Sequence, residues 1–363
     1  MLTRISRCAP ICFSAILASS ILCAQQRTAK NVILFVGDGA GLSSLNAASA
    51  YRYKEPQALF IQRMPRLAMA ETATADEWVT DAAAAATAMA TGRKTVNGVV
   101  SQSAQAQKGK RDGEILKTIL EYAEENELAT GVISNAGLAS GVIAPFFAHG
   151  NDRGDLSALF IQILSPRFGD GLDVAIGSGR SNILDGANAL GRDVPAEFRK
   201  RQYAWLESLH AVDQIDVSAR RAVVALDTDD FDLGVAVAAA VRILARNPKG
   251  FFLVVHSDCH VKDVKKDLDR VVEFDRVIQA TVEECGRESL VLFTADHSFD
   301  LRISKAADRT TDILPRIALI DTHTAEEVVV AASGPGSERV QGFVSNTKVF
   351  DWMMEAFGWR KES

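Results

Sequence analysis

Residues 31–39 read Asn-Val-Ile-Leu-Phe-Val-Gly-Asp-Gly, and this stretch decides the fold of the chain. Five apolar residues in succession, 32–36, run directly into the Gly-Asp-Gly turn. A short apolar run bounded by turn residues is typical of a strand buried on both faces of a parallel sheet. The stretch therefore predicts a buried strand that delivers Asp38 to its carboxyl end.

Apolar runs of the same kind alternate with helical patterns along the rest of the chain. The predicted strands are residues 31–36, 129–134, 173–176, 222–226, 251–256, 290–294 and 328–332. The predicted helices are residues 113–126, 232–247, 267–285 and 349–357. This alternation is typical of an α/β fold, here a three-layer sandwich with a mostly parallel central sheet. Because no repeat or proline-rich linker interrupts it, we expect a single domain over residues 25–363.

The composition fits this class and excludes two others. Of 363 residues, 47% are hydrophobic and 24% are charged, which is too apolar for a disordered chain and too charged for a membrane bundle. The formal net charge is −6, and lysines and arginines are scattered rather than gathered in a stripe between aromatic residues. We therefore expect no nucleic-acid partner.

Residues 1–24 have the pattern of a secretory signal peptide. Arg4 and Arg7 precede an apolar run over residues 9–24, which is shorter than the ~20 residues needed to span a bilayer. We expect the mature protein to be exported, periplasmic or secreted, without membrane attachment once the signal is removed. Two alternatives stay open: a retained anchor, and a lipid on Cys23, although Leu22 is larger than the residue such a site prefers.

Two cysteines remain after the signal, Cys259 and Cys285. The predicted helix 267–285 separates them by about 27 Å at a rise of ~1.5 Å per residue. A disulfide requires Cα atoms about 6 Å apart. We therefore predict two free thiols.

Polar side chains follow several of the predicted strands at the point where each strand ends. Four of the six histidines lie in these clusters: His256 and His260 after one strand, His297 beside Asp296 after the next, and His323 before the last. In a parallel sheet, chemistry gathers at the carboxyl ends of the strands. Imidazoles and carboxylates that converge there are the ligands that zinc prefers. The sequence therefore predicts a metal centre.

Six segments, in the same order along the chain, resemble those of the alkaline phosphatase family. They are residues 31–39, 79–92, 146–153, 247–255, 294–297 and 322–327, with Gly-Pro-Gly at 334–336. The resemblance runs from about residue 31 to residue 357. It implies the fold predicted above, hydrolysis of phosphomonoesters, two zinc ions and one magnesium ion.

The resemblance also assigns residues to the phosphate side of the site. It implies that Arg153 clamps phosphate and that Asp81 orients Arg153; capping of a helix by Asp81 is the alternative. The family's nucleophilic serine is replaced by Ala82, which cannot form a phosphoseryl intermediate. Thr80 and Thr87 are the only neighbours that could substitute for it, and neither is well placed in the sequence.

The family's three metal sites are unequally preserved. One zinc site is implied at Asp38, Asp296 and His297. The second is implied at His323, with a histidine and an aspartate from the loop after residue 256. Counting forward from His256 places Val261 and Lys265 at these two positions and abolishes the site. Counting back from the following helix gives His260, with Asp258 or His256 as third ligand, and we prefer this register because loops absorb deletions.

The third, magnesium-type site is predicted to be lost. Its implied ligands are Asp38, a threonine replaced by Val142 and a glutamate replaced by His256. Valine offers no oxygen, and magnesium prefers oxygen to imidazole. The expected cofactors are therefore one or two zinc ions without magnesium.

Three hypotheses for function follow. The first is an alkaline-phosphatase-like protein that binds phosphate or phosphoesters, with serine-dependent hydrolysis lost or weak. The second is an active phosphoester hydrolase that uses metal-bound hydroxide or a recruited threonine. The third is a structural or interaction subunit with a vestigial site. The expected partner is a phosphate or phosphoester ligand, and a homodimer is one open assembly state.

Overall fold

The computed structural model describes residues 28–361, apart from residues 215–220 and 306–308. The predicted signal peptide, residues 1–24, lies outside the described residues. Within the described part of the chain, no helix is both long and apolar enough to cross a membrane.

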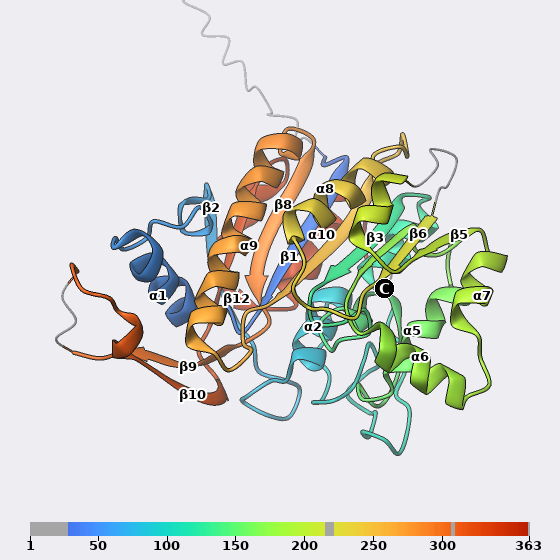
Figure 1. Ribbon diagram of the computed structural model, residues 1–363, viewed down its shortest axis with the longest axis horizontal. Helices are drawn as coiled ribbons and strands as arrows, with labels where there is room; N and C mark the ends of the chain where they lie inside the picture. Colours follow the sequence, from blue (N-terminus) through green and yellow to red (C-terminus); the bar gives the residue numbers. More distant parts are fainter. Residues whose placement is uncertain (1–27, 215–220, 306–308, 362–363) are drawn as a thin grey trace, which may run out of the picture.

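Ten strands form one sheet in the order β12-β2-β11-β8-β1-β7-β3-β4-β6-β5 (Figure 1). Their bounds are β1 Asn31–Asp38, β2 Arg66–Glu71, β3 Ala129–Ser134, β4 Val174–Gly177, β5 Tyr203–Leu206, β6 Arg221–Ala225, β7 Phe251–Asp258, β8 Ser289–Ala295, β11 Val328–Ser333 and β12 Gly342–Ser345. Only β11 runs antiparallel to its neighbours, β2 and β8. The mostly parallel sheet predicted from the sequence is confirmed.

Helices cover the sheet in two layers (Figure 1). Their bounds are α1 Leu42–Tyr53, α2 Ala82–Thr91, α3 Ile119–Glu125, α4 Ala144–Phe147, α5 Leu156–Phe160, α6 Arg180–Ala189, α7 Val194–Lys200, α8 Leu233–Leu244, α9 Val264–Cys285 and α10 Lys348–Phe357. Helices α8 and α9 pack against each other and against β3, β4, β7 and β8, whereas α3 and α10 pack together with α2. This is the expected three-layer sandwich.

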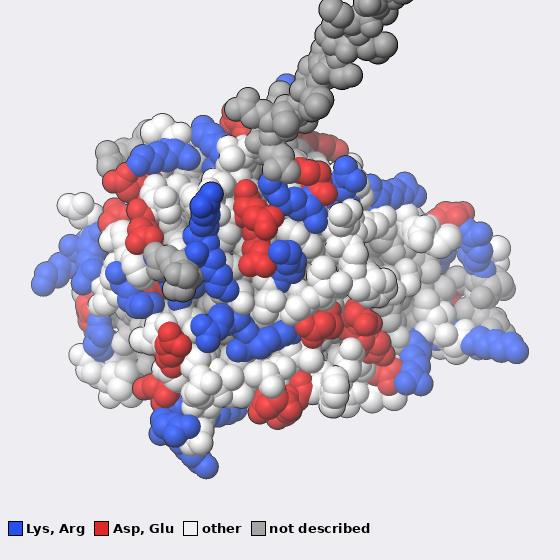
Figure 2. Space-filling view, turned by 180° about the vertical axis from the view of Figure 1, so that it is seen from behind, with Lys and Arg blue, Asp and Glu red and all other residues white. Residues whose placement is uncertain are grey.

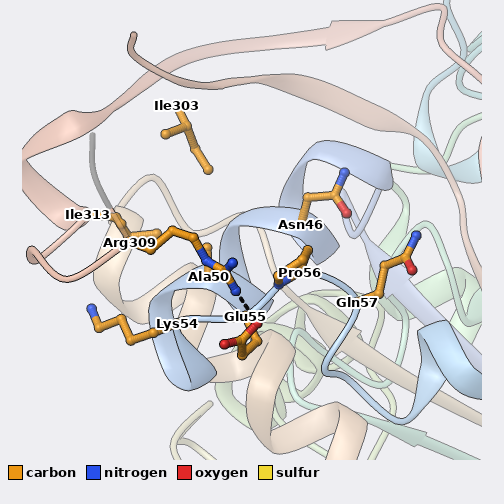
Figure 3. A pocket seen from close by; sticks show the side chains of 9 residues that line it. All are labelled: Asn46, Ala50, Lys54, Glu55, Pro56, Gln57, Ile303, Arg309 and Ile313. Atoms are coloured by element: carbon orange, nitrogen blue, oxygen red, sulfur yellow. Dashed lines mark hydrogen bonds and ion pairs between the residues drawn. The ribbon is translucent and has the colours of Figure 1, made fainter. Parts of the chain in front are cut away.

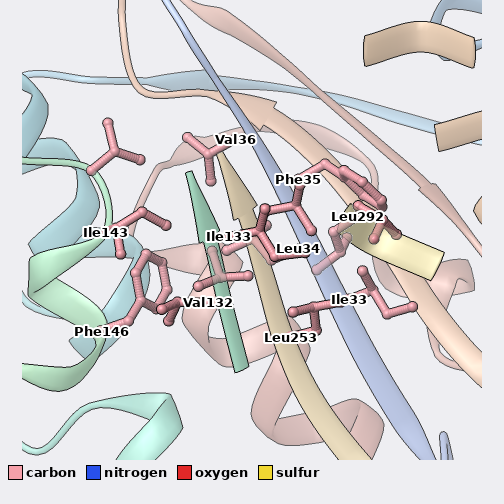
Figure 4. Close-up of a cluster of buried hydrophobic side chains, with 14 of the residues drawn as sticks. Ile33, Leu34, Phe35, Val36, Val132, Ile133, Ile143, Phe146, Leu253 and Leu292 are labelled. Carbon is pink, nitrogen blue, oxygen red and sulfur yellow. The ribbon is translucent and has the colours of Figure 1, made fainter. Parts of the chain in front are cut away.

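Strand β1, which runs into the Gly-Asp-Gly turn, forms the centre of the core. Strand β1 lies between β7 and β8, and residues 32–36 have no exposed surface. Figure 4 shows Ile33, Leu34, Phe35 and Val36 among side chains of β3, β7, β8 and α4. Burial on both faces explains why the run is apolar throughout rather than alternating.

The helix predicted over residues 113–126 is wrong in its first half. Helix α3 begins only at Ile119, because Thr118 forms a capping box with Glu121. The preceding residues pair instead with the segment that follows α2: Leu116 donates its N–H to Ser101 O, and Ser103 donates to Glu114 O. The predicted free thiols of Cys259 and Cys285 are confirmed.

A two-stranded arm outside the main sheet was not expected from the sequence. Strands β9 (Ser298–Ile303) and β10 (Ile317–Thr324) pair antiparallel, with a register shift between Ile320 and His323. The arm leaves the sheet after β8 and returns before β11 (Figure 1). Because β11 runs antiparallel to β8, its starting end lies at the edge where β8 ends. The arm therefore returns His323 to the end of the sheet that carries Asp38.

Candidate metal centre

Asp38, Asp296 and His297 meet at the carboxyl ends of two neighbouring strands. Strands β1 and β8 are parallel and pair Gly37 with Ala295, so the residues that follow lie side by side. His297 Nε2 lies 3.2 Å from Asp38 Oδ1 and 3.5 Å from Asp296 Oδ2. One ligand atom from each of the three residues lies within 4.8 Å of the others. The sheet register alone thus brings together three side chains that could hold a metal ion.

The turn after β1 binds one carboxylate oxygen of Asp296 and leaves the other without a hydrogen bond in the parts of the chain that are described. Gly39 has a φ of +67°, and a Cβ at this position would lie 2.7 Å from a Phe299 ring carbon, so only glycine fits. Its N–H donates to Asp296 Oδ1 at 3.1 Å. Asp296 Oδ2 is buried and accepts no hydrogen bond from the described residues. A buried carboxylate oxygen without a donor fits a bound cation.

Two histidines present Nε2 for coordination. His297 Nδ1 lies 3.1 Å from Ser298 O, and His323 Nδ1 lies 2.9 Å from Thr80 O. A carbonyl oxygen only accepts, so each Nδ1 carries the proton, and in the neutral ring each Nε2 has a lone pair. Histidines that bind metals usually donate their other ring N–H in this way.

The ligands predicted for the second zinc ion lie next to the first group but are less tightly assembled. The rings of His297 and His323 stack with centroids 3.6 Å apart, and His260 lies 5.9 Å from His323 by the same measure. Asp258 Oδ1 accepts the main-chain N–H of His260, and Asp258 Oδ2 lies 3.7 Å from Arg270 Nη1. Within the described part of the chain, only Asp38, Asp296 and His297 place three ligand atoms within 4.8 Å.

The pKa values in the group reflect burial and mutual charge. Burial would raise the pKa of Asp38, but His256 and His297 outweigh it and hold this pKa well below its usual range. Burial, with the charge of Asp38, raises the pKa of Asp296 to about 6. Burial opposes protonation of His297, but Asp296 and Asp38 raise its pKa to about 9. A metal ion therefore competes with a proton on His297.

The phosphate side of the predicted site is centred on the start of α2. Asp81 caps this helix by accepting the Ala84 N–H at 2.8 Å, and its Oδ2 lies 3.1 Å from Arg153 Nη1. The two roles considered for Asp81 therefore coexist. Ala82 is the first residue of the helix and directly follows Thr80 and Asp81. The carbonyl of Thr80 contacts His323 Nδ1.

The two threonines considered as substitute nucleophiles are engaged elsewhere. The Thr80 hydroxyl donates to Asp81 O at 2.8 Å. Thr87 is fully buried, and its hydroxyl oxygen accepts the Ser101 N–H at 2.9 Å. Neither hydroxyl is directed at the metal ligands by its hydrogen bonds.

Three residues that the sequence analysis did not single out hold this side in place. Asn97 Oδ1 accepts the Asp81 N–H at 2.7 Å. Gly98 donates its N–H to Asp81 Oδ2 and accepts the Arg153 N–H, so it links the two charged residues. At Gly141, a Cβ would lie 2.9 Å from Arg153 Cζ. The Asn-Gly dipeptide at 97–98 is a turn signal that could have marked this loop, but Gly141 carries no comparable local signal.

The residues at the third, magnesium-type position do not fit that ion. Val142 is buried in the hydrophobic core and offers no oxygen. His256 is fully buried, and its Nε2 lies 3.8 Å from Asp38 Oδ2. Magnesium requires a near-octahedral set of oxygen ligands, which these side chains do not provide.

A groove of about 490 Å³ lies away from these residues, between α1 and the β9–β10 arm (Figure 3). It is lined by Asn46, Ala50, Lys54, Glu55, Pro56, Gln57, Ile303, Arg309 and Ile313. Glu55 and Arg309 form an ion pair across it. On the face seen in Figure 2, basic and acidic side chains are interspersed. None of the predicted site residues lines this groove.

Comparison with known proteins identifies the family. The family model described as alkaline phosphatase matches residues 29–319. Alkaline phosphatase 4 of Drosophila melanogaster is 26% identical over 86% of this chain and 63% of its own length. Alkaline phosphatase 3 of Bacillus subtilis is 28% identical over 76% of this chain and 62% of its own length. The chain thus spans under two thirds of both relatives.

A solved structure shows the same fold. Alkaline phosphatase from the Antarctic bacterium TAB5 superposes with a TM-score of 0.79 at 23% identity, covering 93% of this chain and all of that one. A variant of that enzyme, solved with magnesium in its M3 site, superposes with a TM-score of 0.77. Fold and sequence agree with the family model. The chain belongs to the alkaline phosphatase family.

Proposed function

We propose that this protein is an exported zinc protein that binds phosphate or phosphoesters and in which serine-dependent hydrolysis is lost or weak. The observation that carries the proposal is the position of Ala82. Its two preceding neighbours contact opposite sides of the site, since Thr80 O binds His323 and Asp81 contacts Arg153. A ligand between these sides would face a methyl group where the family has a nucleophile. Export rests on residues 1–24 alone.

The chain's own groups favour a tetrahedral anion at this point. The ten-residue helix α2 directs its amino-terminal end at the site, where the helix dipole favours negative charge. Arg153 is 36% exposed, so its planar fork is available to a ligand, while Asp81 fixes its orientation. Together the start of α2 and Arg153 would hold and orient a phosphoryl group, but neither would act as a nucleophile.

Asp38, Asp296 and His297 would hold one zinc ion, and His323 with His260 would contribute to a second. Zinc bound here would supply Lewis-acid stabilisation of phosphoryl oxygens and would lower the pKa of a bound water. The chain's part is to hold one proton on Nδ1 of both His297 and His323, through Ser298 O and Thr80 O, so that Nε2 is the nitrogen that coordinates when the ring is neutral. Magnesium has no role in this proposal.

One observation favours the alternative of an active hydrolase. The ligand set Asp38, Asp296 and His297 is intact and tightly assembled, although the serine is absent. A vestigial site would be under no constraint to keep three buried ionisable groups together. Slow hydrolysis without a serine is therefore the second candidate function.

Experiments on the zinc-loaded protein test both candidate functions, phosphate binding without turnover and slow hydrolysis. Isothermal titration with inorganic phosphate measures binding, and steady-state hydrolysis of an aryl phosphate with added zinc and magnesium measures turnover. We expect phosphate binding with little or no turnover for the parent, weak turnover for Ala82→Ser, and more for Ala82→Ser combined with Val142→Thr and His256→Glu, because coupled parts of a site are not additive. A parent as fast as the triple variant would contradict the lost-nucleophile proposal and support the alternative.

A further inference from the structure

His256 is a fully buried histidine that neither the zinc ligands nor the phosphate side accounts for. Its strand, β7, lies between β3 and β1, with His256 opposite Ser134 on one side and Val36 on the other. Asp38 is two residues beyond Val36 and so faces the same side of the sheet. The ring therefore stands in a row between the Ser134 hydroxyl, 2.9 Å from Nδ1, and Asp38 Oδ2, 3.8 Å from Nε2.

The hydrogen bonds of Ser134 decide which ring nitrogen carries the proton. Its Oγ accepts the N–H of Ala136 and the N–H of Gly137, both at 3.1 Å. A hydroxyl has two lone pairs and one proton, and these two bonds use both lone pairs. The Ser134 proton must then be donated to His256 Nδ1. In the neutral ring the proton of His256 is consequently on Nε2.

This is the reverse of the arrangement at the two zinc-type histidines. His297 and His323 donate through Nδ1 to carbonyl oxygens and keep Nε2 free for a metal. His256 accepts at Nδ1 and directs an Nε2–H at Asp38. A third metal on Nε2 would require the other tautomer and would break the donation from Ser134.

We propose that His256 takes the place of the family's third metal ion: it is a positioning residue whose neutral ring directs the positive end of the Nε2–H dipole at Asp38 Oδ2 and leaves Oδ1 for the metal ligand group. The importance of His256 for zinc binding rests on the function proposed above, whereas the tautomer of its ring is independent of that function. Val142 agrees with this role, because an apolar side chain suits a position without an ion. Asp38 then has two unlike oxygens: Oδ2 lies 3.8 Å from His256 Nε2, and Oδ1 lies 3.2 Å from His297 Nε2.

The tautomer is measured directly by two-bond ¹H–¹⁵N correlation spectra of histidine-labelled protein, in zinc-free and zinc-loaded forms. We expect His256 to be protonated at Nε2 in both forms. His323 should be protonated at Nδ1, with zinc shifting its Nε2 resonance. Substitution of Ser134 by alanine should redistribute the His256 proton between the two nitrogens. Ser178→Ala is the matched control, since Ser178 is a buried serine at the same end of the sheet whose hydroxyl donates to Asn135 O rather than to a histidine.

Metal analysis gives an independent readout. Zinc-loaded parent should hold no magnesium and no third zinc ion, whereas Val142→Thr combined with His256→Glu should gain one magnesium. His256→Phe should weaken zinc binding by about 10- to 100-fold, as for other groups that orient a metal ligand. His256→Gln, which keeps an N–H donor at similar reach, should recover most of that loss.

Two outcomes would overturn the inference: protonation of His256 at Nδ1, or a third metal ion that shifts its Nε2 resonance. Failure of the proposed function has a different signature. In that case the protein would bind neither zinc nor phosphate, yet the zinc-free spectrum would still report the tautomer of His256.

Discussion

The two halves of the proposed site, one for the metal and one for phosphate, are held in place by different means. Asp38, Asp296 and His297 stand at the ends of neighbouring buried strands, so the sheet register fixes their spacing. Asp81 and Arg153 stand on loops that are joined by hydrogen bonds through Gly98, and both side chains are partly exposed. Changes in the buried half should therefore have larger effects than changes in the loop half, and the predictions below test this ranking.

The largest effect is expected from His297→Ala. This substitution removes one of the three clustered side chains proposed to bind zinc and leaves the carboxylates of Asp38 and Asp296 without the imidazole between them. Because changes to groups outside the direct ligands cost about 10- to 100-fold in metal affinity, loss of a direct ligand should exceed 100-fold. Competition with a chelator measures the zinc affinity. His210→Ala, at an exposed position, is the control, and equal zinc affinity in both variants would show that the cluster is not the metal site.

The next effect is on stability and its dependence on pH. The pKa of His297 is raised from 6.5 to about 9 in the metal-free fold. A group with a raised pKa contributes stability that is complete below its ordinary value and is lost as the pH rises through the folded value. Metal-free protein should therefore lose up to about 3 kcal/mol of unfolding free energy between pH 6.5 and 9.

Calorimetric melting of chelator-treated protein across this window checks the change. The zinc-loaded protein should lack this loss, so the stabilisation by zinc should grow with pH. A flat melting temperature for the metal-free protein would indicate that His297 is not held protonated by Asp296 and Asp38.

On the phosphate side, Arg153→Ala should weaken binding of inorganic phosphate by about ten- to a hundredfold, the value of a hydrogen bond to a charged group. Zinc content should not change, since Arg153 belongs to the other half. Titration calorimetry of zinc-loaded protein gives the affinity. Arg302→Ala, on the β9–β10 arm with a side chain 74% exposed, should bind phosphate like the parent. A loss of zinc in Arg153→Ala would mean that the two halves are not independent.

The smallest effect is expected from Gly141→Ala. Its new Cβ would lie 2.9 Å from Arg153 Cζ and would displace the guanidinium, which is the movable end of a flexible side chain. We expect phosphate affinity to fall by about two- to fivefold, the range of a partly exposed charge contact, with zinc affinity unchanged. Gly234→Ala in α8 provides a glycine control, because a Cβ there would meet Asp232 and Val277 rather than Arg153. Unchanged phosphate affinity would show that Gly141 does not position this side chain.

Local patterns predicted the fold well because they depend only on neighbouring residues. The run at 32–36 could be recognised as a buried strand, and the Asp-His pair at 296–297 could be placed at a strand end. The first residue of α3 was harder to predict. The helical pattern of the sequence extends upstream, but the capping box at Thr118 makes the helix begin at Ile119. The arm of β9 and β10 was missed although its strands have six and eight residues. A register shift interrupts their pairing.

The sequence by itself determined which residue types are present: the strand that carries Asp38, the histidines near strand ends, and alanine at position 82. Only the tertiary structure decided which of them meet. His323 reaches His297 because the arm folds back. His256 differs in tautomer from His297 and His323 because the Ser134 hydroxyl faces its Nδ1, whereas Ser298 O and Thr80 O face theirs. The physical reason is that periodicity is set by neighbours along the chain. A proton's place on an imidazole is set instead by atoms that packing brings from as far as 243 positions away.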